Sequence, residues 1–304
     1  MTYSIVARDP ETGEMGVAVQ SHWFAAGSVV PWAEAGVGAV ATQATAEISY
    51  GPRGLDLMRA GATAKEALDE LLARDTNRDV RQVAMVDAMG DVATHTGSST
   101  IPEAGHAVGS ASSCQANMMW ADTVWDAMAR TYASATGDLS SRLLDSLDAA
   151  EAERGDIRGR QAAGILIVGP DPLDEPWRGV RMHLHTDDHV QPLADLRRLV
   201  DLHRAYERLE SAEELALADD RAGAAQAVMD ALRLAPGSDE VRFWSAIGMA
   251  SSGMLDEAAR LIGKAFSADP GWEELLRRLI AHKLVELDPE MAERLLALGL
   301  AGAG

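Results

Sequence analysis

Groups of strand-like segments alternate with pairs of helix-like segments through the first two thirds of the chain, and this order restricts the possible folds. Alternating or apolar runs between turn signals predict strands at 3–8, 15–21, 36–43, 82–87, 91–96, 106–110, 163–168 and 180–185. Helical spacing predicts helices beginning near 51 and 63, and over 117–135 and 139–154. Paired helices between groups of strands do not fit single βαβ crossovers. They favour an α+β fold, with two antiparallel sheets stacked between helix layers as a four-layer αββα sandwich.

From Pro192 onward the pattern is helical throughout and contains an internal repeat. Pro236 and Pro270 lie 34 residues apart, which is the period of tetratricopeptide repeats. Small residues match at the same spacing: Ala224 with Ala258, and Ala231 with Ala265. The tail therefore resembles the tetratricopeptide family, although a plain array of helical hairpins explains it too. We expect an αββα domain over 1–198 and an all-α tetratricopeptide-like domain over 199–304.

The charge balance excludes some classes of partner. The formal net charge is -20 and the isoelectric point is near 4.7, which argues against nucleic acid and anionic membranes as partners, because both need a basic footprint. A single cysteine excludes an internal disulfide and fits a reducing compartment. The sequence has neither a signal-peptide pattern at its start nor an apolar run of ~20 residues. We expect a cytoplasmic protein that forms a homo-oligomer.

Thr2 is the candidate nucleophile. It directly follows Met1, and a small second residue usually permits removal of the initiator methionine. Thr2 would then carry a hydroxyl and a free α-amine whose pKa is ~7.7–8.0, so the amine can accept the hydroxyl proton directly or through a water. A threonine activated by its own terminal amine is a recognised form of nucleophilic catalysis. The alternative is that Thr2 carries no information, because many proteins begin with such a residue.

Several short segments, taken together, favour the interpretation of Thr2 as a nucleophile. They are TYSIVA at 2–7, DP at 9–10, GVAV at 16–19, GVGAVATQ at 36–43, YGPRG at 50–54, NM at 117–118 and GRQ at 159–161. In this order they resemble a bacterial family known as domain of unknown function 1028, within the N-terminal-nucleophile hydrolase superfamily. The resemblance covers 2–198. It implies hydrolysis of a small amide or peptide-derived substrate through an ester on Thr2, with no cofactor.

Two further residues are candidates for catalysis beside Thr2. Ser21 ends the strand expected next to Thr2 and could relay protons to the amine. Backbone N–H groups around Thr42 and Gln43, with the Gln43 side chain, could stabilise an oxyanion. The alternatives are that Ser21 only ends a strand and that Gln43 only makes hydrogen bonds to buried backbone groups. The acid and lysine that assist the terminal threonine of proteasome subunits have no obvious match here.

The predicted substrate-binding residues come from the same family-like segments. Arg53 could bind a substrate carboxylate, because a guanidinium holds a carboxylate through two hydrogen bonds. Tyr50 and Asn117 complete this set. Arg53 could equally pair with a surface acid.

Other constellations compete with this site. Cys114 and His106 could form a thiol and base pair, although a lone cysteine is more often a small buried residue. His183, His185 and His189 have a spacing that could bind metal, but a solvated strand face explains them as well, and we expect no metal. The alternative function is a non-catalytic scaffold whose helical tail binds a peptide, a protein partner or a second copy of the chain.

Overall fold

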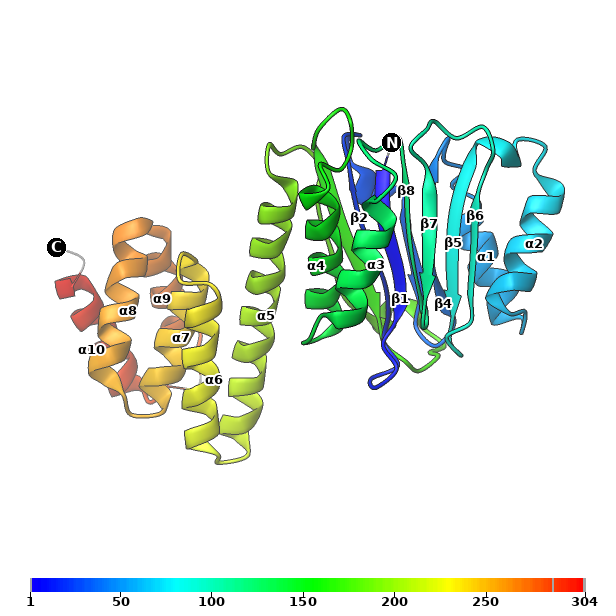
Figure 1. Cartoon of the computed structure of the whole chain (residues 1–304). Coiled ribbons are helices and arrows are strands. Elements are labelled where there is room, and N and C mark those ends of the chain that lie inside the picture. The colour runs from blue at the N-terminus through cyan, green and yellow to red at the C-terminus, as the bar shows by residue number, and fades with distance from the viewer. Residues whose placement is uncertain (1, 286, 303–304) are drawn as a thin grey trace. The chain divides into compact units, whose positions relative to one another are not determined.

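The computed structural model describes residues 2–285 and 287–302. Contacts divide the chain into two compact units, Met1–Arg197 and Arg198–Gly304. The first unit contains two sheets covered by helices, and the described part of the second unit is helical (Figure 1). No helix among the described residues is long and apolar enough to cross a membrane.

A six-stranded antiparallel sheet carries the start of the chain at its centre. Its spatial order is β10-β9-β2-β1-β8-β7. The strands are β1 (Thr2–Arg8), β2 (Met15–Ser21), β7 (Gly105–Gly109), β8 (Ser112–Asn117), β9 (Ala162–Val168) and β10 (Val180–Thr186). As expected, the strand that Ser21 ends lies next to that of Thr2: β1 pairs with β2 on one side and with β8 on the other.

A second antiparallel sheet has four strands in the order β3-β4-β5-β6. The strands are β3 (Pro31–Glu34), β4 (Gly38–Ala44), β5 (Arg81–Asp87) and β6 (Val92–Thr96). Short 3-10 helices occur at Ala26–Ser28, Arg78–Val80 and Pro176–Gly179.

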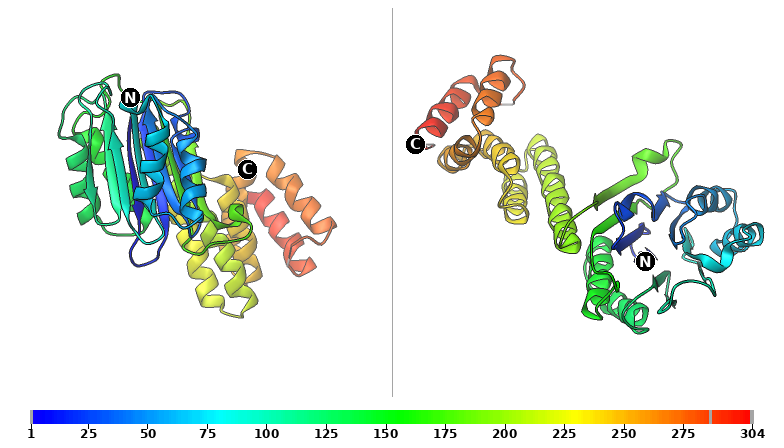
Figure 2. Two further views of the ribbon diagram at one scale, coloured as in Figure 1. Left: turned by 90° about the vertical axis from the view of Figure 1, so that its right-hand side faces the viewer. Right: turned by 90° about the horizontal axis from the view of Figure 1, so that it is seen from above.

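Two pairs of helices cover the outer faces of the sheets. Helices α1 (Tyr50–Arg59) and α2 (Ala64–Arg74) pack on the four-stranded sheet, whereas α3 (Val124–Ser134) and α4 (Leu139–Ala152) pack on the six-stranded sheet. A capping box starts α2 near the predicted position 63, since the Thr63 hydroxyl accepts a hydrogen bond from the Glu66 N–H and the Glu66 carboxylate accepts one from the Thr63 N–H. The expected layering of helix, sheet, sheet and helix is confirmed (Figure 2, right).

The space between the sheets is apolar at one end. Val6 and Val17 from the six-stranded sheet pack with Ala39 and Val86 from the four-stranded sheet in one buried cluster. Small alanine side chains allow the two sheets to approach closely. Toward the other end, the same alternation of side chains places serine, threonine, asparagine and glutamine between the sheets. The interior thus changes from apolar to polar along β1.

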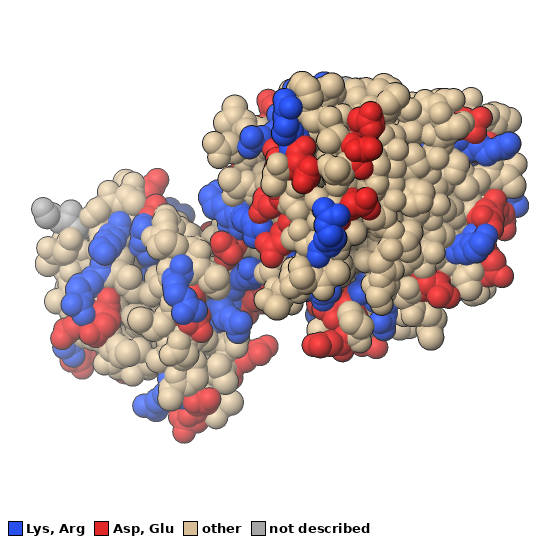
Figure 3. All heavy atoms as spheres, viewed as in Figure 1, with Lys and Arg blue, Asp and Glu red and all other residues tan. Residues whose placement is uncertain are grey.

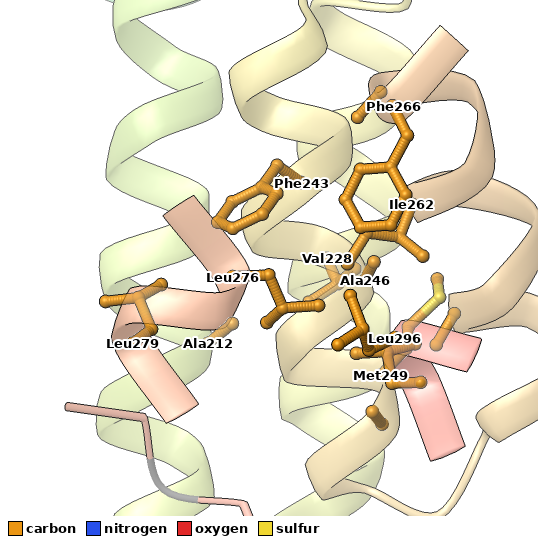
Figure 4. Packing of buried hydrophobic residues seen from close by; sticks show 14 of the residues in the cluster. Ala212, Val228, Phe243, Ala246, Met249, Ile262, Phe266, Leu276, Leu279 and Leu296 are labelled. Atoms are coloured by element: carbon orange, nitrogen blue, oxygen red, sulfur yellow. The ribbon is translucent and has the colours of Figure 1, made fainter. Parts of the chain in front are cut away.

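The second unit is an array of antiparallel helices. After α5 (Pro192–Leu217), which begins in the first unit, come α6 (Arg221–Leu234), α7 (Asp239–Ser251), α8 (Leu255–Ala268), α9 (Gly271–Ala281) and α10 (Pro289–Gly302). Phe243, Ile262 and Leu276 are among the buried core residues (Figure 4). The turns after α5 and α7 contain Asp219 and Gly253, which lie 34 residues apart and both have left-handed φ angles, 61° and 84°.

Acidic and basic side chains are interspersed on the face drawn in Figure 3. Many of the basic groups are paired within the chain: Arg197 lies 2.7 Å from Asp145, and Arg59 pairs with Glu34.

Two strands were not predicted from the sequence, and one helix start was wrong. The strand β3 was missed, and the segment that forms β8 lacks the expected alternation because both of its faces are buried and one of them is polar. We expected a helix to begin near Asn117. In the structure Asn117 ends β8, and α3 begins only at Val124.

Candidate functional site

Thr2 lies at the polar end of the space between the sheets. It begins β1, pairs with Asn117 of β8, and is only 5% exposed. Side chains alternate along a strand, so Thr2 shares its face with Ser4 and Val6 and is directed toward the four-stranded sheet. The Oγ1 atom of Thr2 lies 3.1 Å from the Oγ atom of Ser21, at the end of the neighbouring strand β2. The structure therefore brings together Thr2 and the predicted proton relay.

Two side-chain amides contact the backbone carbonyl of Thr2. The Nε2 atom of Gln43 and the Nδ2 atom of Asn117 each lie 3.4 Å from this oxygen, at the long end of the hydrogen-bond range. Both amides make a shorter hydrogen bond to the Oε1 atom of Gln82, at 2.7 and 2.8 Å. Gln82 is fully buried, and its own amide donates to the carbonyl of Ala116 at 2.8 Å. It thus links β4, β5 and β8 directly beneath Thr2.

The same network extends along the interior of the sandwich. Ser4 donates to the Oε1 atom of Gln43 at 2.7 Å, and the amide of Gln115 donates to the Ser4 hydroxyl at 2.6 Å. Each of these side chains is uncharged. Because buried amides and hydroxyls cost free energy unless they are paired, the hydrogen bonds hold these side chains in one arrangement. The described hydrogen bonds thus position the start of β1 through uncharged amides and hydroxyls.

The structure changes the predicted oxyanion site. The N–H of Thr42 donates to the carbonyl of Val30 at 3.2 Å, so this group is already used within the fold. The Gln43 amide donates to three oxygens: the backbone carbonyls of Thr2 and Gln115 and the side-chain Oε1 atom of Gln82. The Thr42 N–H is therefore occupied within the fold, and the Gln43 side chain holds the backbone and side-chain oxygens around Thr2.

A loop that follows α4 holds the end of β2. The Gln161 N–H donates to the Ser21 carbonyl at 3.2 Å, and the Asp156 carboxylate accepts the His22 N–H at 3.1 Å. The Asp156 side chain is fully buried and forms an ion pair with Arg158 at 3.0 Å. Sequence reasoning missed Asp156. The only local signal is its place in the glycine-flanked segment 155–159, which resembles an ordinary turn.

Two residues with unusual backbone geometry border the site. Ala44 follows Gln43 and Met118 follows Asn117, and they have left-handed φ angles of 67° and 58°. Such angles are uncommon for residues with a Cβ atom. Both of the strands that contact the Thr2 carbonyl therefore end in a sharp change of chain direction immediately beyond the contacting residue.

The three predicted substrate-binding residues lie in different environments. Asn117 contacts Thr2, as described above. Arg53 is exposed in the first turn of α1, which begins six residues after β4 ends. Tyr50 is buried, and its hydroxyl donates to Asp75 at 3.2 Å; burial, with the nearby Asp75 carboxylate, raises the pKa of this hydroxyl. Tyr50 thus ties α1 to the segment after α2.

The alternative thiol site does not form. Cys114 and His106 lie on adjacent strands, but His106 pairs with Gln115 and Ala107 pairs with Cys114. Neighbouring register positions point to opposite faces of the sheet, so the two side chains are separated by the sheet itself. Cys114 is 1% exposed, and its Sγ atom lies 3.7 Å from the Ser146 hydroxyl of α4.

The histidines considered as metal ligands are part of another arrangement. The rings of His183 and His185 have centroids 5.9 Å apart, and the Nδ1 atom of His185 lies 2.8 Å from Asp187. Among residues 2–285 and 287–302, no three histidine, cysteine, aspartate or glutamate side chains gather as the ligands of a metal ion would.

A family model matches most of the first unit. The model describes a family of unknown function, DUF1028, and matches residues 2–196. The chain belongs to this family. The part of the predicted resemblance that names DUF1028 is thereby confirmed, while the family description assigns no activity.

A solved structure of another DUF1028 protein is similar to this chain. It is a crystal structure of a protein from Silicibacter pomeroyi, with 28% sequence identity and a TM-score of 0.59. The match covers 66% of this chain and 87% of the other. None of the curated proteins matches the chain.

The buried amide network predicts a loss of stability when Gln43 is replaced. Gln43→Leu keeps a similar volume but leaves oxygens of Gln82 and Gln115 without this donor and the Ser4 hydroxyl without its acceptor. An unpaired buried polar group costs about 1–3 kcal/mol, so we expect the free energy of unfolding of the first unit to fall by at least ~2 kcal/mol. Urea denaturation measures this change. The matched control is Gln191→Leu at an exposed position, which should stay within about 0.5 kcal/mol of the parent; equal effects of the two substitutions would contradict the network.

The Cys114 thiol should be inert in the folded protein. Burial raises the pKa of this thiol to about 12. The unfolded thiol ionises near its ordinary value of 9.0, so stability should decrease as the pH rises from about 9 toward 12. We expect a thiol reagent at pH 8 to label Cys114 quickly in guanidinium and very slowly in the native protein, with Cys114→Ser as the blank. Equal labelling rates in both conditions would mean that this thiol is accessible.

Proposed function

We propose that this protein is an N-terminal-nucleophile amide hydrolase with Thr2 as the nucleophile. One observation carries the proposal. Thr2 begins a central strand at the polar end of the space between two stacked sheets, with its hydroxyl 3.1 Å from that of Ser21. The αββα layering and the DUF1028 match support it. Met1 lies outside the described residues, and the mechanism requires its removal.

The proposed reaction uses Thr2 as both nucleophile and base. The α-amine of Thr2 takes the hydroxyl proton, directly or through the Ser21 hydroxyl, and Oγ1 bonds to the amide carbon of the substrate. The tetrahedral intermediate breaks its C–N bond, and the leaving amine departs with the proton. Water then attacks the resulting ester, which releases the carboxylic acid and returns the proton to Thr2.

The surrounding residues have distinct proposed roles. Gln43 and Asn117 fix the backbone carbonyl of Thr2 and thereby the direction of its hydroxyl. Asn117 also borders the site where the substrate would bind. Arg53 would bind a substrate carboxylate, and this role is supported by its exposure near the end of β4 that carries Gln43. Tyr50 would shape the site indirectly, by fixing the first turn of α1.

We also propose that the two units are separate domains, 1–198 and 199–304, and that the second is tetratricopeptide-like. Two observations support the repeat. The four alanines matched at a spacing of 34 residues are all buried, and the two turns at the same spacing have the same left-handed geometry. Small buried residues at these positions let paired helices approach closely.

One feature favours a second function, in which the fold is a scaffold and the helical unit binds another copy of the chain. A cavity of about 460 Å³ lies among α5, α6 and α7, and most of its lining is apolar, including Trp244 and Met249. Leu217 lines this cavity and is 75% exposed. Sedimentation of the full chain tests the idea: Leu217→Glu should dissociate an oligomer, whereas Met229→Glu, exposed on α6 but outside the cavity lining, should not.

The hydrolase proposal predicts a mature chain that lacks Met1 and depends on Thr2. Thr2→Ala should abolish hydrolysis of small amides and labelling by a β-lactone, while Thr2→Ser should retain both. Ser21→Ala should lower kcat by ~100-fold, because proton relays contribute factors of this size. Activity should rise with pH as an amine of pKa ~7.7–8.0 loses its proton.

Intact mass and turnover on an amide panel provide the measurements. Thr12→Ala, in the exposed turn between β1 and β2, is the matched control and should behave as the parent. Retention of Met1 in the whole purified population would end the free-amine mechanism. Undiminished turnover by Thr2→Ala would place the nucleophile elsewhere.

A further inference from the structure

Large apolar side chains are exposed on the loops at the end of the sandwich where Thr2 lies. They are between 46% and 63% exposed. The members of this apolar rim are Trp23, Phe24, Ile48, Ile101, Trp120 and Ile157. Exposed apolar side chains that gather in one place commonly mark a binding surface.

The backbone connects most of this rim directly to the contacts of Thr2. Trp23 and Phe24 follow Ser21 at the end of β2. Ile101 and Ile157 are both joined to Met118, the residue after Asn117: the Met118 N–H donates to the Ile101 carbonyl at 3.1 Å, and the Ile157 N–H donates to the Met118 carbonyl at 3.3 Å. Trp23 and Phe24 therefore lie on the loop that leaves β2, and Ile101 and Ile157 are hydrogen-bonded to the residue that follows β8.

The remaining two members are held on neighbouring loops. The Trp120 N–H donates to the Gly155 carbonyl at 3.0 Å, and the Arg154 guanidinium lies 4.0 Å from the centroid of the Trp120 ring. Ile48 belongs to the link between β4 and α1, where the Thr42 hydroxyl donates to the Glu47 carbonyl at 3.1 Å. The loops that carry Trp120 and Ile48 are thus held by hydrogen bonds.

The groups beneath the rim complement an apolar ligand. The side chains that contact Thr2 or its carbonyl in the described hydrogen bonds are uncharged: Ser21, Gln43 and Asn117. A charged substrate side chain held against these three groups would lose its hydration without gaining an opposite charge from them, which is unfavourable, unlike a carboxylate farther along the substrate that reaches Arg53. An apolar group would bury surface of the rim as well as its own, which is favourable.

We propose that the apolar rim makes the Thr2 site specific for amides that carry a large hydrophobic side chain next to the scissile bond. This inference rests on the proposed function, because it assigns the substrate class of the same site. The rim residues contact the substrate side chain, and Thr2 reacts with the adjacent carbonyl carbon.

Binding to the full chain with Thr2→Ala tests the specificity without requiring turnover. The two probes are N-acetylphenylalaninamide and the α-amide of N-acetylaspartate, whose side-chain carboxylate stays free. Calorimetry measures the dissociation constant of each. We expect the phenylalanine probe to bind at least 10-fold more tightly. Trp23→Ala in this background should reduce the preference about 10-fold.

The matched control is Trp177→Ala, which removes an exposed tryptophan in the segment between β9 and β10, at the opposite end of the sandwich. It should leave the preference unchanged. Equal binding of the two probes, or tighter binding of the aspartate probe, overturns the inference. So does a Trp23→Ala variant that changes the oligomeric state but not the preference, because the rim would then be an interface between copies.

The two proposals can fail separately. A preference for the phenylalanine probe in a protein that retains Met1 and hydrolyses no amide would leave the rim specificity intact and overturn the hydrolase mechanism. Amide hydrolysis that depends on Thr2 but favours charged substrates would support the hydrolase mechanism and overturn the rim specificity.

Discussion

The carboxamide of Gln82 is the interaction on which the arrangement of this site depends. Its oxygen accepts hydrogen bonds from Gln43 and Asn117, and its nitrogen donates to the Ala116 carbonyl, so one buried side chain joins strands of both sheets. Each partner is satisfied only when the sheets stack in this register. Since an unpaired buried amide is costly, the network specifies the register at the end of the sandwich where apolar packing is absent.

This division of the interior explains how a polar site can exist inside a stable sandwich. Valines and alanines hold the sheets together at the far end, whereas hydrogen-bonded amides and hydroxyls replace them near Thr2. Neutral groups make the described hydrogen bonds that hold the start of β1. The nearest charged pair that the structure ties to these strand ends is Asp156 with Arg158, which secures β2 through the His22 N–H.

Local patterns predicted most elements but failed where burial and polarity coincide. The hairpin of β1 and β2, the capping box at Thr63 and the strand β9 have clear signals in the sequence. The strand β8 does not, because Ser113, Gln115 and Asn117 face the interior and imitate a solvated segment. For the same reason the sequence predicts a helix from Asn117, which in the structure ends β8.

The sequence by itself determined the fold class, the hairpin that begins with Thr2, the family and the change to helices after Pro192. These depend on periodicity and short motifs, which act over a few residues. Only the tertiary structure decided that Gln43, Gln82 and Asn117 meet beneath Thr2, that Cys114 and His106 lie on opposite faces, and that the loops of the apolar rim lie at the same end of the sandwich as Thr2. Contacts between residues distant in sequence depend on strand order and register, and no local pattern encodes them.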